Sequence, residues 1–273
     1  MEEPLIKNRW SNLIQIMFIS LIAALFAFVL LRLLSELTLL YFSYDLNIQA
    51  ALHLKSVHFL TKSASPDWTR DSIITIFLSR PFMNLILALI GMIIYAFVRR
   101  KSQAFHFFLI WLIIFALGNA FGTFAENGIF KTGTYEVTTL MNFGSIMMLV
   151  VVMISFYFLY LSGVGMGRLI MLSMPDEFLK NKRIRFSYYL MAYLVPWLLT
   201  FLFIFTQSDF ASRMTYLFGL IILIPVLWTH HSEEGLQLEP LPPLMWIDVV
   251  SSIFYFIGIY LMYTMLATGI RLT

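Results

Sequence analysis

The sequence predicts an all-α protein, a polytopic bundle of about seven transmembrane helices. The first observation is that hydrophobic residues make up 60% of the 273 residues and charged residues only 12%, which is more apolar surface than one soluble core can bury. The second is an aromatic content of 17%, as expected for lipid-facing helices with interfacial belts of Trp and Tyr. The third is a series of apolar stretches near the ~20 residues that a spanning helix needs.

The expected spans follow one another along a single domain that covers residues 1–273. The first follows a basic pair, is too long for a signal-peptide core and lacks a small-x-small cleavage site, so we interpret it as a retained signal anchor. The sixth is short and contains Pro225, so six spans are the alternative to seven. In order, the stretches are 11–33, 82–98, 105–124, 144–164, 187–207, 213–229 and 245–267.

Lys and Arg residues near the span ends predict the orientation. The connections 99–104 and 165–186 contain three and five of them, whereas 125–143 contains one and 208–212 contains none. With strict alternation, these numbers put the N-terminus in the cytoplasm and the C-terminus outside, in a plasma (inner) membrane of bacterial type. The first connection, 34–81, is an exception, because it carries four basic residues and yet lies outside in this arrangement.

Several functional classes are excluded by what the sequence lacks. It contains no cysteine, which excludes disulfides, thiolate metal sites and cysteine nucleophiles. Its Ser and His residues form no nucleophile elbow, and residues 245–267 contain no lysine for a retinal Schiff base. The net charge of +3 is explained by basic residues sorting between membrane faces, so we expect no nucleic-acid partner and no cofactor.

Arg32 and Glu36 are ionisable residues in the apolar stretch LLRLLSELTLLYF. They are four residues apart, so they can form an ion pair on one helical face. Charged groups inside a membrane are functional candidates. The alternative is that the first span ends near residue 31 and leaves the pair at the membrane surface.

A second polar group lies near the end of the third expected span. Asn119, Glu126 and Asn127 could line a water-filled or substrate cavity, while Gly118 and Gly122 have the spacing of a helix-packing face. The glycines of SGVGMGR at residues 162–168 likewise favour close helix contact.

His230, His231 and Glu234 form the only motif with metal-ligand spacing. On a helix one imidazole and the carboxylate could share a face, but two ligands do not complete a zinc site. We therefore expect no metal and interpret the segment as a solvated acidic loop. Asp248, at the start of the last expected span, is predicted to cap that helix.

Residues 66–91, PDWTRDSIITIFLSRPFMNLILALIG, resemble part of the site-2 protease family of intramembrane zinc metalloproteases. In that family a lead-in containing Trp and Arg precedes a Gly-Pro-x-x-Asn-Leu element that opens a helix. Arg80, Pro81, Asn84 and Leu85 are similar to that element, with Arg80 at the position of its glycine.

The upstream His-Glu-x-x-His helix of the family corresponds to SELTL at residues 35–39. Glu36 matches the general base, but Ser35 and Leu39 stand where the two histidine ligands would be, and Asn127 stands where the aspartate ligand would be. Because catalytic zinc needs three protein ligands and an open position for water, the resemblance implies a catalytically dead relative.

We therefore expect a non-catalytic protein, an accessory or scaffold subunit that contacts the lipid bilayer and other membrane subunits. The first alternative is a small-solute transporter or channel that uses Asn119, Glu126 and Asn127. An active intramembrane metalloprotease ranks lowest.

Overall fold

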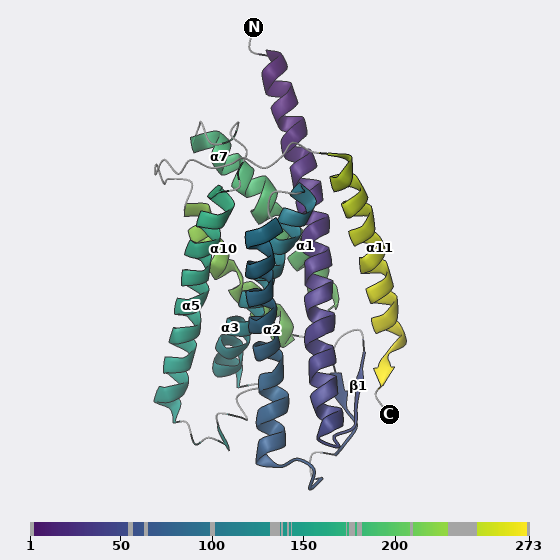
Figure 1. Ribbon diagram of the computed structural model, residues 1–273. Coiled ribbons are helices and arrows are strands. Elements are labelled where there is room, and N and C mark those ends of the chain that lie inside the picture. Colours follow the sequence, from purple (N-terminus) through teal and green to yellow (C-terminus); the bar gives the residue numbers. More distant parts are fainter. Residues whose placement is uncertain are drawn as a thin grey trace.

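The computed structural model is an all-α bundle of helices that run roughly parallel or antiparallel to one another (Figure 1). Within its described residues, six helices are long and apolar enough to cross a membrane, so the chain is a multi-pass membrane protein. The residues described are 3–53, 57–62, 65–98, 102–131, 137, 139–140, 142, 144–172, 174, 178, 182–207, 210–228 and 245–271.

The helices are α1 (Glu3–Asp45), α2 (Arg70–Val98), α3 (Gln103–Phe130), α5 (Ser145–Leu172), α7 (Lys182–Tyr189), the π-helical turn η1 (Leu190–Leu194), α8 (Val195–Gln207), α9 (Phe210–Phe218), α10 (Leu220–Trp228) and α11 (Trp246–Thr268).

Helix α1 is much longer than the predicted span 11–33. Its apolar part, Ser11–Asp45, has 35 residues, or about 52 Å at 1.5 Å per residue. This length exceeds the ~30 Å hydrocarbon core, so part of the helix must lie outside that core. The helix continues without a break past Glu36, and the N-terminus and the C-terminus lie at opposite ends of the bundle (Figure 1).

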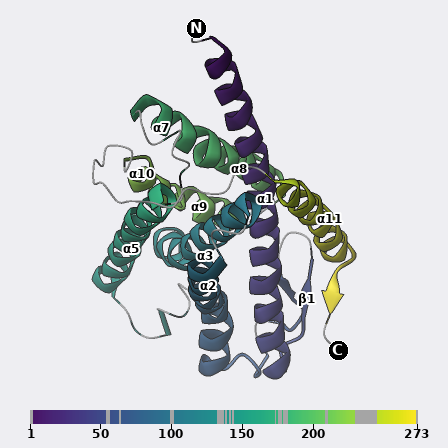
Figure 2. The ribbon, with the colours of Figure 1, turned by 45° about the horizontal axis from the view of Figure 1, so that its top comes forward.

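Helix α3 is the central element of the bundle. It packs against α1, α2, α5 and α9, and Figure 2 shows it surrounded by them. Its side chains from Phe107 to Ala116 are almost all fully buried, because bulky apolar residues occupy every face of this stretch. A helix that is apolar on all sides belongs in the interior.

The sixth predicted span, 213–229, is not one long helix. It forms α9 and α10, which are interrupted at Gly219, and the apolar part Arg213–Trp228 is shorter than the other spans. The prediction that glycines mediate helix packing is confirmed for Gly122 and Gly163, whereas Gly165 of the SGVGMGR stretch has no atom of another helix near it. A Cβ atom on Gly122 would lie only 2.9 Å from the Thr215 carbonyl oxygen, and one on Gly163 would collide with the Ile222 carbonyl.

A small antiparallel sheet, which the all-α expectation missed, lies at the end of the bundle that holds the C-terminus (Figure 1). Its strand order is β2 (Val57–Phe59), β1 (Ala50–Leu52) and β3 (Ile270–Arg271). Beside it, Leu39, Ile48 and Ile76 form a hydrophobic cluster separate from the main core. The sheet therefore joins the α1–α2 connection to the C-terminal strand.

Candidate functional site

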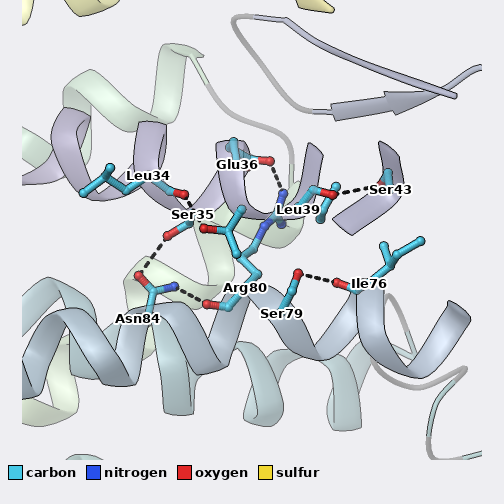
Figure 3. Close-up of polar contacts among 10 residues, drawn as sticks. Leu34, Ser35, Glu36, Leu39, Ser43, Ile76, Ser79, Arg80 and Asn84 are labelled. Carbon is cyan, nitrogen blue, oxygen red and sulfur yellow. Dashed lines mark hydrogen bonds and ion pairs between the residues drawn. The ribbon is translucent and has the colours of Figure 1, made fainter. Parts of the chain in front are cut away.

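An ion pair between two helices is the central feature of the candidate site. The Arg80 guanidinium of α2 donates a hydrogen bond to the Glu36 carboxylate of α1 (Figure 3). The Glu36 side chain is 10% exposed and that of Arg80 34%. The carboxylate is therefore enclosed between the helices, whereas the guanidinium lies at the edge of the bundle.

A second polar contact lies beside the ion pair, between the residue before Glu36 on α1 and a residue one turn after Arg80 on α2. The Ser35 hydroxyl donates to the Asn84 side-chain oxygen over 3.0 Å, and the Asn84 amide donates to the Arg80 backbone carbonyl over 3.0 Å (Figure 3). Ser35 is 4% exposed and Asn84 only 1%. Asn84 thus links α1 to the same turn of α2 that carries Arg80. These four residues, Ser35, Glu36, Arg80 and Asn84, are called the α1–α2 polar clamp below.

Arg32 lies half-buried on α1, one turn before Glu36. The observed ion-pair partner of Glu36 is Arg80, and a pairing of Glu36 with Arg32 stays a prediction. Tyr216 of α9 lies near Arg32 and Glu36 of α1 and near Asn119 of α3.

The three predicted cavity residues lie on one side of α3. Asn119 and Glu126 are seven residues apart and therefore nearly aligned along the helix. Asn119 is half-buried, while Glu126 and Asn127 are 2% and 5% exposed. Parallel packing of α1 and α3 brings Ser20 to Trp111 and Phe28 to Phe115. If this alignment of α1 with α3 is extended toward the C-terminal ends of both helices, Glu126 and Asn127 of α3 lie near the level of Glu36 of α1.

The histidine motif cannot be placed, because His230, His231 and Glu234 lie outside the described residues. In the part of the chain that is described, no three His, Asp or Glu side chains are grouped closely enough to hold a metal ion.

Asp248 caps two helices at once. Its carboxylate accepts hydrogen bonds from the Met245 N–H at the start of α11 (2.9 Å), from the Ala104 N–H in the first turn of α3 (2.9 Å) and from the Ser102 hydroxyl (2.6 Å). Helix starts leave N–H groups without intrahelical partners. The predicted cap of the last helix is confirmed, but its second role at α3 was missed because Ser102 and Asp248 are 146 residues apart.

A fully buried relay joins three helices at Ser20. The Trp111 indole N–H of α3 donates to the Ser20 hydroxyl of α1 over 2.8 Å, and that hydroxyl donates to the Ala192 carbonyl of η1. Pro196, four residues after Ala192, has no N–H with which to bond that carbonyl. Ser20 therefore donates to a carbonyl whose α-helical donor position is occupied by a proline.

No family model matches this chain, and comparison with curated proteins and with solved structures gives no match.

Proposed function

We propose that this chain is a non-catalytic multi-pass membrane protein that acts as an accessory or scaffold subunit of a membrane protein complex. The Glu36–Arg80 ion pair is the observation that supports this proposal. A general base must reach the water from which it takes a proton. The Glu36 carboxylate is instead bound to a guanidinium between two helices.

The α1–α2 polar clamp also gives the resemblance to site-2 proteases a physical meaning. Glu36 stands at the position of the family's general base, and Arg80 stands at the position of the glycine in its Gly-Pro-x-x-Asn-Leu element. The departure at Arg80 thus supplies the cation that binds Glu36, while Ser35, in place of a histidine ligand, bonds to Asn84. Both departures support the proposal that this chain is a non-catalytic relative, in which the residues at the former catalytic positions connect α1 to α2.

The proposal includes a location in the plasma (inner) membrane with the N-terminus in the cytoplasm. Basic residues of α7 at the N-terminal end of the bundle support this orientation. A reporter that is active only outside the cytoplasm should be silent when fused after Lys101 or Lys182 and active after Thr134. Activity after Lys182 would reverse the orientation.

A transporter or channel is the second candidate, and a specific feature of the bundle favours it. Helices α9 and α10 are short and interrupted, and they pack against α3 and α5. Interrupted helices beside buried polar groups are typical of transporter binding sites. Here the polar groups are Asn119, Glu126 and Asn127.

Cysteine labelling separates the two candidates, because the natural chain contains no cysteine. We expect Asn119→Cys and Asn127→Cys to resist a water-soluble maleimide in the folded protein and to react after denaturation. The matched control, Lys62→Cys, is exposed and should react at once. Rapid labelling of both α3 positions in the folded protein, with protection by a solute, would favour the transporter.

A photo-crosslinking amino acid tests for a partner subunit directly. Phe254 of α11 is 66% exposed and Met153 of α5 is 62% exposed, so the probe at either position samples the surroundings of the bundle. The scaffold proposal expects a discrete protein adduct of constant mass from at least one of these two positions. Lipid adducts alone from both positions would argue against a partner on these faces.

A further inference from the structure

Among the residues that the structure describes, the two ends of the bundle carry different charges. At the end that holds the N-terminus, the described basic side chains are Arg168 of α5 and three on α7, namely Lys182, Arg183 and Arg185. The only acidic side chain described there is Asp248, which is fully buried. At the opposite end the exposed charges of the described residues are balanced: they are Asp45, Lys62, Asp67, Arg70, Asp71 and Lys131.

Helix α7 is anchored in a way that turns Lys182 and Arg183 outward, while Arg185 is half-buried. Tyr188 and Tyr189, at its C-terminal end, are buried at 1% and 0% exposure, and the Tyr188 ring packs 5.1 Å from that of Phe178. Lys182 and Arg183 are exposed, and Phe186 is 40% exposed. Figures 1 and 2 show α7 across the end of the bundle, where α5 also ends.

We propose that α7 and the adjacent end of α5 form a binding surface for anionic phospholipid headgroups. Basic residues next to a membrane attract anionic lipids, and an aromatic ring such as that of Phe186 is favoured at the headgroup level. The apolar span Lys182–Phe205 begins at the first residue of α7, which places the cations beside the bilayer. A lipid fits this surface better than an acidic protein does, because the exposed cations directly adjoin a membrane-spanning segment.

The test is a lipid titration of the full chain in mild detergent, followed by native mass spectrometry. We expect phosphatidylglycerol to bind more tightly than phosphatidylcholine. The triple change Lys182→Gln, Arg183→Gln, Arg185→Gln should weaken phosphatidylglycerol binding by roughly a hundredfold, at about fivefold per cation. The double change Lys182→Gln, Arg183→Gln affects only exposed side chains and serves if the triple variant does not fold.

The matched control is Lys62→Gln with Arg70→Gln at the opposite end, which should change the affinity less than about twofold. Inorganic phosphate at the same concentration should not compete, because it lacks the acyl chains that hold a lipid headgroup beside the apolar span Lys182–Phe205. Equal binding of the two lipids, equal loss in the control, or no loss in the α7 variants would overturn the proposal. None of these outcomes depends on whether the chain is a scaffold or a transporter.

Discussion

Glu36 and Asp248 are both carboxylates in the interior of the bundle, and they are stabilised in opposite ways. Glu36 is bound by one guanidinium that comes from the middle of another helix. Asp248 is bound by two backbone N–H groups and one hydroxyl where two helices begin. The first carboxylate needs a counter-charge, whereas the second uses the dipoles and unpaired donors of helix ends.

This difference shows how a membrane bundle can bury an acidic group. Removing Arg80 would leave a charge without its cation, while removing Asp248 would leave several helix donors without an acceptor. Unsatisfied polar groups and unpaired charges are both costly in an apolar interior. The two sites should therefore respond differently to neutral substitutions.

The largest effect is expected at Asp248. Asp248→Ala removes the acceptor of three hydrogen bonds and uncaps α3 and α11, which should cost about 3 kcal/mol or more. The loss is measured as a lower midpoint of thermal unfolding in detergent. Asp248→Asn keeps one acceptor oxygen and should cost less. An Asp248→Ala midpoint equal to that of the natural chain would contradict the double cap.

A double-mutant cycle tests the ion pair between Glu36 and Arg80. Glu36→Gln and Arg80→Gln should each cost about 2 kcal/mol, a value kept low because the Arg80 side chain is one-third exposed. The double variant should recover at least about 1 kcal/mol, as expected of coupled residues.

The cycle of Arg32→Gln with Glu36→Gln is the matched comparison. It should show weaker coupling than the cycle with Arg80, because the observed guanidinium contact of Glu36 comes from α2. Stronger coupling to Arg32 would mean that the ion pair forms within α1. Additivity in both cycles would mean that Glu36 reaches water independently of either arginine.

The smallest effect is expected at Ser20, where the polar contact involves no charge. Ser20→Ala removes the partner of both the Trp111 indole N–H and the Ala192 carbonyl, which should lower stability by about 1–2 kcal/mol. Thr264→Ala is a suitable control, because the Thr264 hydroxyl donates to the Leu261 carbonyl of its own helix at an exposed position. Equal midpoints for the two variants would mean that water replaces the hydroxyl at Ser20.

The sequence predicted the features that depend on local pattern. Hydrophobic stretches located six of the helices because apolar length and helix formation are properties of a continuous segment. The interruption at Gly219 fell in the stretch that was already too short and contained a proline. Asp248 was recognised as a cap because a carboxylate before an apolar run needs only its own backbone to act.

The interior polar contacts could not be predicted in the same way, because their partners are far apart in the chain. Arg80 was visible in the motif SRPFMNL, but nothing local indicated that its guanidinium reaches Glu36, 44 residues earlier. Ser20 carried no signal as an isolated serine in an apolar helix. Its two partners, Trp111 and Ala192, lie on other helices, 91 and 172 residues away in the chain.

The sequence by itself therefore determined the membrane class, six of the helices and the cap of the last helix, since each follows from the composition or spacing of neighbouring residues. Only the tertiary structure decided which buried polar groups meet. The packing of α1 against α2, α3 and η1 brings Glu36 to Arg80, Ser35 to Asn84, and Ser20 to Trp111 and Ala192. These contacts depend on the register and rotation of whole helices, which arise from shape complementarity over many side chains.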